Sequence, residues 1–242
     1  MKDDIMIVWD LPLRLFHWAF MICVIGAIAS GKAQIWAVHE RFGMAIMALV
    51  VFRIIWGFIG SPTARFSEFL TGPKAVLATL QALWRKQTDD KAGHSPLGGY
   101  ATMALLLIPL MMALTGAFST DDILFDGPFY HLMPDWAGLA GDVHHFGEKL
   151  LFLIIALHLG ALAYYGVRLR KNLVRAMVTG KRQEATGQEA TGQEATGQEA
   201  KVKDAKNKGG EISHQRTLFG VALMIALVAL AQWAILLRPS YF

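Results

Sequence analysis

The sequence HHFGEKLLFLIIALHLGALAYY, residues 144–165, gives the clearest indication of the fold of this chain. It is apolar over most of its length, and a helix of ~20 such residues crosses the hydrocarbon core of a bilayer. His144 and His158 lie fourteen residues apart in it (158 − 144 = 14). At ~100° and ~1.5 Å per residue, that spacing is nearly four helical turns and ~21 Å of rise. We therefore expect both imidazoles on one helix face, at two membrane depths.

The rest of the chain has the composition of a membrane protein. Of its 242 residues, 54% are hydrophobic and 17% are charged, whereas soluble domains carry ~25% charged residues. Five stretches are long and apolar enough to cross a bilayer: 11–30, 35–59, 97–118, 144–167 and 218–237. The sequence therefore predicts an all-α integral membrane protein, with a four-helix transmembrane bundle and a fifth, C-terminal transmembrane helix. No basic region or cleavage site accompanies the first stretch, which we expect to be retained.

The distribution of charge predicts the orientation in the membrane. Lys and Arg are concentrated near the N-terminus, between 60 and 93, and after 167, whereas 119–142 has none and carries five aspartates. Because Lys and Arg collect on the cytoplasmic side, we expect a cytoplasmic N-terminus and, after five spans, a periplasmic C-terminus. The location expected is the bacterial inner (plasma) membrane. This topology accounts for the net charge of +4, and we expect no nucleic-acid partner.

A repeat divides the chain into three parts. Gln-Glu-Ala-Thr-Gly occurs three times in 183–197, and a fourth copy begins at Gln198. A polar five-residue repeat cannot build a hydrophobic core, so it is typical of a linker. The predicted division is a four-span domain at 1–181, a low-complexity cytoplasmic linker at 182–213, and a C-terminal anchor helix at 214–242. The last span has no histidine, which favours anchoring or partner contact.

Histidines within the spans are the candidate metal ligands, since ionisable residues are costly in a bilayer and usually functional. His17 and His158 are expected at the inner level, and His39 and His144 at the outer level. Four ligands at two levels would suit two haems in a helical bundle. His145, the alternative to His144, is thirteen residues from His158 and so ~140° away from its face. Single histidines can instead be helix contacts or interfacial residues.

The remaining polar residues give a less specific signal. His94 is left open as part of a quinone site or an inner haem edge, whereas His131 and His214 are interpreted as loop residues. Arg41 is close to His39 and could pair with outer haem propionates, and Arg53, fourteen residues after His39, could pair with inner ones. Snorkelling to the interface is the alternative for both arginines. Cys23 is the only cysteine, which excludes an intrachain disulfide, Cys-x-x-Cys-His haem attachment and a cysteine-ligated iron–sulfur cluster within this chain.

Seven motifs together resemble one known family. They are VWDLPLRLFHW (8–18), HERFG (39–43), FRIIWGFIGSPTARF (52–66), GHSPLGG (93–99), LTGAFSTDDI (114–123), HHFGEKLLFLIIALH (144–158) and NLVRAMVTGK (172–181). This set resembles the bacterial cytochrome b561 family, including the hydrogenase-type b cytochromes. The resemblance implies a four-helix haem-binding bundle with two non-covalent b haems. It also implies that His17, His39, His144 and His158 are their axial ligands, and that electron transfer involves the quinone pool. The repeat and fifth span depart from the simplest four-span members.

The function expected is therefore electron transfer across the membrane. Bis-histidine ligation fills both axial positions, which favours electron transfer over oxygen chemistry. The redox partner expected is periplasmic, such as a c-type cytochrome. The acidic 119–142 segment could steer such a partner, and the alternative is that its charges only solvate a loop. A quinol-dependent oxidoreductase and a haem-bearing anchor subunit of a hydrogenase or other dehydrogenase both remain open. A metal or proton transporter is the alternative outside this class, but it would need ligands clustered at one depth.

Overall fold

The computed structural model describes residues 5–84, 96–120, 125–170, 172–183 and 212–237. Within them, five helices are long and apolar enough to cross a membrane. They are α1 (Leu11–Lys32), α2 (Trp36–Ile59), α5 (Pro96–Phe118), α6 (Ala137–Ala163) and α9 (His214–Leu236). The predicted five-span helical class is confirmed. The fourth span is longer than predicted, because α6 begins at Ala137 and continues into a π-helical turn, η4 (Tyr164–Arg168).

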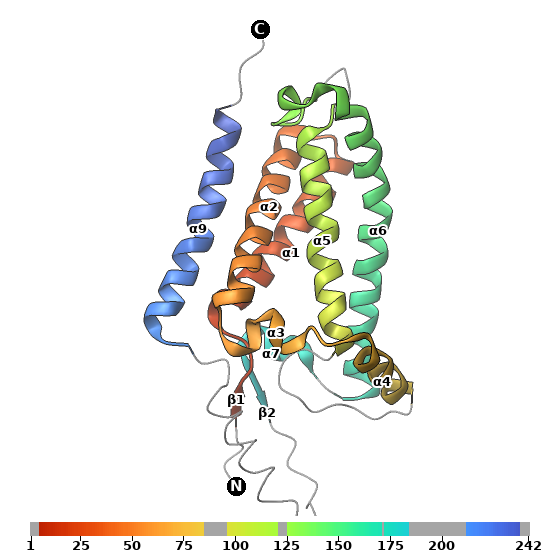
Figure 1. Cartoon of the computed structure of the whole chain (residues 1–242), viewed down its shortest axis with the longest axis vertical. Helices are drawn as coiled ribbons and strands as arrows, with labels where there is room; N and C mark the ends of the chain where they lie inside the picture. Colours follow the sequence, from red (N-terminus) through yellow and green to blue (C-terminus); the bar gives the residue numbers. More distant parts are fainter. Residues whose placement is uncertain (1–4, 85–95, 121–124, 171, 184–211, 238–242) are drawn as a thin grey trace, which may run out of the picture.

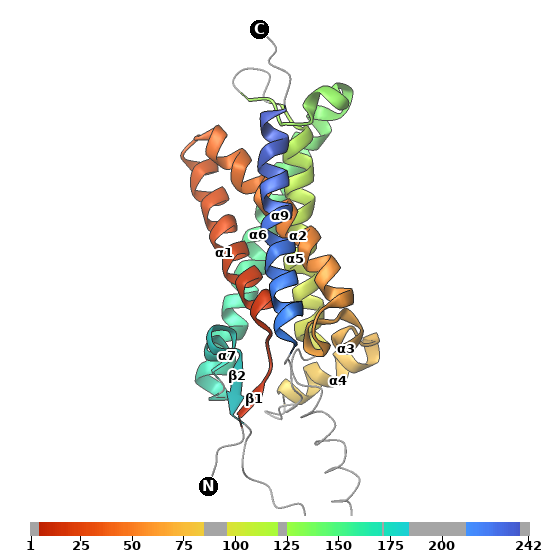
Figure 2. The ribbon, with the colours of Figure 1, turned by 90° about the vertical axis from the view of Figure 1, so that its left-hand side faces the viewer.

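The helices run alternately up and down, with α9 beside α2 (Figures 1 and 2). We call one end of the bundle the strand end, where β1 (Ile5–Ile7) and β2 (Lys181–Gln183) lie, and the other the loop end. The loop end carries the turn between α1 and α2 and the short helices η2 (Tyr130–Leu132) and η3 (Pro134–Trp136). Because α1 starts at the strand end and α9 finishes at the loop end, the chain crosses the bundle an odd number of times.

Helix α2 is the centre of the bundle. It packs against α1, α5 and α9, and α5 in turn packs against α6. By contrast, α1 and α6 are not among the helix pairs in close contact. The core is mainly apolar and includes Leu49, Val50 and Phe52 of α2. Large apolar side chains such as Phe58 also cover the outside, as expected where a bundle faces lipid rather than water.

The segment before α1 and the segment after α6 meet at the strand end. β1 pairs antiparallel with β2, and the backbone N–H groups of Val8 and Trp9 donate to the Gly180 carbonyl. Gly180 ends α7 (Leu173–Thr179) with φ of 76°, a conformation that favours glycine. A Cβ there would also lie 2.8 Å from the Trp9 carbonyl oxygen. These contacts join the segment before α1 to the segment after α6.

The connection between α2 and α5 begins with three short elements, also at the strand end. They are η1 (Pro62–Ala64), α3 (Phe66–Phe69) and α4 (Pro73–Trp84). Helix α4 packs against α5 and leaves Leu77 and Leu80 exposed. The sequence analysis did not identify α4, because its single apolar face is too short to stand out among full membrane spans.

Helix α9 packs closely on the bundle. Its glycine, Gly220, is buried, and a Cβ there would lie 2.7 Å from the Trp56 ring and 2.9 Å from Pro12. Near the loop end, the Gln232 amide donates to the Arg41 carbonyl oxygen at 3.0 Å. Thus α9 contacts the bundle near both its ends. The repeat at 183–197 lies almost entirely outside the described residues, so the predicted linker stays a prediction.

Candidate functional site

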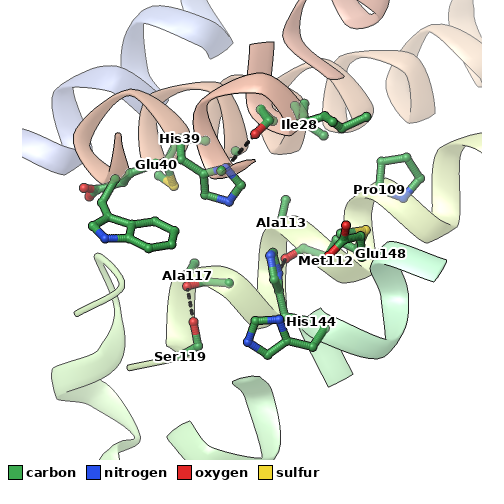
Figure 3. Close-up of a pocket in the computed structure, with 18 of the residues that line it drawn as sticks. Ile28, His39, Glu40, Pro109, Met112, Ala113, Ala117, Ser119, His144 and Glu148 are labelled. Atoms are coloured by element: carbon green, nitrogen blue, oxygen red, sulfur yellow. Dashed lines mark hydrogen bonds between the residues drawn. The ribbon is translucent and has the colours of Figure 1, made fainter. Parts of the chain in front are cut away.

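A cavity of about 330 Å³ lies inside the loop end of the bundle. Its walls come from α1, α2, α5 and α6, and His39 and His144 enter it from opposite sides (Figure 3). Most of the lining is apolar, including Val24, Ile46 and Leu151. A mostly apolar cavity of this size, with a few polar groups aimed into it, is typical of ligand and cofactor sites.

His39 is held by helix α1. Its Nδ1 lies 2.8 Å from the carbonyl oxygen of Ala27. A carbonyl oxygen can only accept a hydrogen bond, so Nδ1 carries the proton and donates it. In the neutral imidazole, the unprotonated Nε2 is then free to bind a metal. The hydrogen bond therefore fixes both the tautomer and the orientation of the ring.

His144 has the same arrangement on the opposite wall. Its Nδ1 donates to the Met112 carbonyl oxygen of α5 at 2.8 Å. The rings of His39 and His144 have centroids 5.9 Å apart and planes at 82°. Metal–imidazole nitrogen bonds are about 2 Å long, so two imidazoles on opposite sides of one metal ion would have centroids roughly this far apart. The predicted pair of outer histidines is thus brought together.

The second predicted pair lies toward the strand end. His17 is on α1 and His158 is on α6, and they are close enough to interact electrostatically. The Nδ1 atom of His17 is buried and has no hydrogen-bond partner among the described residues. His158 is half-buried. Because α1 and α6 are not in close contact, the structure leaves this pair between two separated helices.

The two arginines have different surroundings. Arg53 is 1% exposed, donates from Nη2 to the Ala64 carbonyl at 3.0 Å, and stacks over Phe66 at 4.7 Å. Its Nη1 is buried and has no hydrogen-bond partner among the described residues, so its N–H groups could donate to an anionic group. The Arg41 side chain is exposed and is not among the cavity-lining residues. Lys32 lines the cavity instead.

Lys32 forms an ion pair that the sequence analysis missed. Its ammonium group contacts the carboxylate of Glu148, and both residues line the cavity. The pair links α1 to α6 at the loop end, where those helices are otherwise apart. The sequence gives little indication of this ion pair, because Lys32 and Glu148 are far apart in the chain and each resembles an ordinary charged residue near the end of a span.

The other histidines are less involved. His145 lines the cavity and its ring lies 6.1 Å from that of His144, but it is exposed and no ring hydrogen bond orients it within the described part. His214 is exposed at the start of α9, and His131 lies in η2. His94 is outside the described residues. The geometry therefore favours His144 over its neighbour.

The donor chemistry fits a planar metal cofactor better than a bare ion. Among the described residues, no three His, Cys, Asp or Glu side chains gather to hold a metal. Two facing imidazoles provide only two ligands, so the remaining ligands would have to come from a macrocycle such as haem. Gly43 lines the cavity, and a Cβ there would meet nothing within 4 Å. The cavity, the two orientated imidazoles and the buried Nη1 of Arg53 all fit haem groups with anionic propionates.

The comparison with known proteins agrees with this chemistry. A family model described as prokaryotic cytochrome b561 matches residues 8–180. The match covers most of the chain and includes α1, α2, α5, α6 and α7, but not α9. No curated protein and no solved structure matches the chain.

Proposed function

The chain belongs to the prokaryotic cytochrome b561 family, and we propose that it holds two non-covalent b haems and carries electrons between the quinone pool and a redox partner. Its family and its five apolar helices make it a multi-pass membrane b-type cytochrome of electron transfer. The number of haems, their ligands, the partners and the orientation in the bacterial inner membrane are the proposed parts.

One observation carries the proposal: His39 and His144 face each other across the cavity, and both have Nδ1 bound to a carbonyl. This arrangement directs both Nε2 atoms away from those backbone contacts. We assign these two histidines as axial ligands of a loop-end haem. Lys32, at the edge of the same cavity, would balance propionate charge there, and Arg41 could do so only from outside the cavity.

The strand-end haem would be held by His17 and His158. These residues come from the separated helices α1 and α6, and Arg53 would pair with a propionate through its Nη1. His144 and His158 lie on the unbroken helix α6, so the two sites are ~21 Å apart along its axis. The two sites therefore lie at different depths of the bilayer.

The chain's own residues set the chemistry. A bound haem would supply one-electron redox chemistry, and two histidines holding its iron would favour electron transfer over oxygen chemistry. The cavity walls are mostly apolar, and the backbone carbonyls hold each loop-end imidazole in its ligating tautomer. Such second-shell contacts tune the potential of the site.

The partners follow from orientation. Basic residues such as Arg168, Arg170 and Arg175 lie at the strand end, and the positive-inside rule then places this end in the cytoplasm and the loop end in the periplasm. A c-type cytochrome at the loop end is one candidate redox partner. The alternative, a membrane anchor for a hydrogenase or other dehydrogenase, predicts a co-purifying subunit. The division into 1–181, 182–213 and 214–242 is retained as part of the proposal.

Replacement of single histidines tests the ligand assignment. We expect His39→Ala and His144→Ala to lose the same haem, and His17→Ala and His158→Ala to lose the other. Haem per chain and the reduced-minus-oxidised spectrum of purified protein give the readout. His214→Ala, at an exposed position, is the control and should keep both haems. Haem loss in His145→Ala together with retention in His144→Ala would contradict the assignment.

A further inference from the structure

The histidines of the loop end are held by two segments with the same construction. They are AIASG, residues 27–31 of α1, and MALTG, residues 112–116 of α5. In each, the first residue provides the carbonyl that accepts from the histidine Nδ1, at 2.8 Å in both cases. The fourth residue is a hydroxyl residue and the fifth is glycine. We call these the AIASG and MALTG segments.

The glycine of each segment makes the carbonyl accessible. In an α-helix, the carbonyl of residue i points toward residue i+4, one turn further along, and accepts from its N–H. Gly31 and Gly116 occupy that i+4 position. A Cβ at either glycine would lie 2.9 Å from the Nδ1 of His39 or His144, respectively. Any side chain at these positions would therefore push the imidazole away from its carbonyl.

The hydroxyl of each segment also has the same geometry. Ser30 donates to the Gly26 carbonyl at 2.6 Å, with the Ala27 carbonyl at 3.2 Å. Thr115 donates to the Met111 carbonyl at 2.8 Å, with the Met112 carbonyl at 3.2 Å. Such back-bonding of Ser and Thr often bends a helix slightly. The same three features thus occur together on two helices that hold two different histidines.

The strand end lacks this arrangement. The Nδ1 of His17 is buried without a hydrogen-bond partner among the described residues. Nδ1 donation makes the other imidazole nitrogen a more basic ligand, which stabilises the more positive ferric iron.

We propose that Gly31 and Gly116 are positioning residues, and that their segments give the loop-end haem the lower midpoint potential of the two. This inference rests on the proposed di-haem function. It goes beyond that function because it predicts an order of potentials and therefore the direction in which electrons pass downhill, from the loop end to the strand end.

The test is a redox titration of purified Gly31→Ala and Gly116→Ala variants, with haem quantification. We expect the lower-potential component alone to shift upward or to lose its haem, while the higher-potential component keeps its potential. The matched control is Gly138→Ala, since Gly138 is exposed and a Cβ there meets nothing within 4 Å. This control should match the wild type in both components.

Three results would overturn the inference. The first is that both components in both glycine variants behave as in Gly138→Ala. The second is a shift confined to the higher-potential component. The third is loss of both haems or of a monodisperse protein in both variants, since the glycines would then act on the fold instead of the loop-end ligands. Wild-type protein with fewer than two haems would instead reject the proposed function, so the two failures are distinguishable.

Discussion

The indole Nε1–H of Trp56 donates to the carboxylate of Asp10, with its two oxygens at 3.1 and 3.3 Å. The same carboxylate caps α1 by accepting from the Leu13 N–H at 2.7 Å. Both Asp10 and Trp56 are buried. The Asp10 carboxylate therefore accepts a hydrogen bond from the first turn of α1 and also joins α1 to the last turns of α2. Gly220 of α9 packs against the same Trp56 side chain.

Loss of this carboxylate should destabilise the whole bundle. Asp10→Ala removes an N-cap, which costs about 1 kcal/mol, and leaves a buried indole donor unsatisfied, which costs about 1–3 kcal/mol more. The measurement is the free energy of unfolding in detergent. Asp135→Ala, at an exposed position in η3, is the control. Equal stability of the two variants would show that the Asp10–Trp56 contact does not hold the helices together.

The close packing of α9 predicts that alanine substitution lowers stability at Gly220 but does not lower it at Gly160. Gly220→Ala should destabilise by about 1–3 kcal/mol, because the added methyl group overpacks Trp56 and Pro12. Gly160→Ala should be neutral or stabilising by up to ~1 kcal/mol, since alanine favours helix and a Cβ there meets nothing within 4 Å. Thermal unfolding of the two variants compares them. If Gly220→Ala unfolds at the same temperature as Gly160→Ala, α9 is not packed on the bundle as described.

The ion pair between Lys32 and Glu148 should contribute little to stability despite linking α1 to α6. The Lys32 side chain is 65% exposed and that of Glu148 34%, and exposed pairs contribute about 0–1 kcal/mol. A double-mutant cycle with Lys32→Met and Glu148→Gln measures the coupling free energy directly. We expect about 0.2–1 kcal/mol at low salt, decreasing as salt screens the charges. A coupling well above that range would mean that the pair is shielded from water.

The orientation can be tested with reporter fusions. A fluorescent protein that folds only in the cytoplasm should fluoresce when fused after Gln183, and alkaline phosphatase should be active when fused after Leu237. The reason is that basic residues favour a cytoplasmic strand end, while α9 then crosses once more. Reversed activities at the two positions would place the loop end in the cytoplasm, and the proposed periplasmic partner would have to be abandoned.

Apolar length was sufficient to predict the spans, and helical periodicity predicted which histidines share a helix face. That these histidines bind a metal in pairs stays a prediction. Fourteen residues on one helix place His144 and His158 on one face, and the lengths of α1 and α2 set the depths of His17 and His39. These relationships depend only on helix geometry and membrane thickness, which is why they can be predicted without a structure.

The contacts between helices could not be predicted in the same way. The carbonyls of Ala27 and Met112 are backbone atoms, so no residue type in the sequence marks them as partners of a histidine. The pairing of Lys32 with Glu148, and the exposure of Arg41, depend on how helices rotate about their axes. The segments 27–31 and 112–116 both end in Ser-Gly or Thr-Gly, which can be seen in the sequence. Their role cannot be inferred without knowing which backbone carbonyls lie beside the imidazoles.

The number of b haems per chain is the most direct test of the proposed di-haem function. A pyridine haemochrome assay of the purified full-length protein, set against its protein concentration, measures it. Two histidine pairs at two depths predict two b haems per chain, and a redox titration of the same sample should resolve two components. Protein that is folded and monodisperse but carries no b haem would contradict the account.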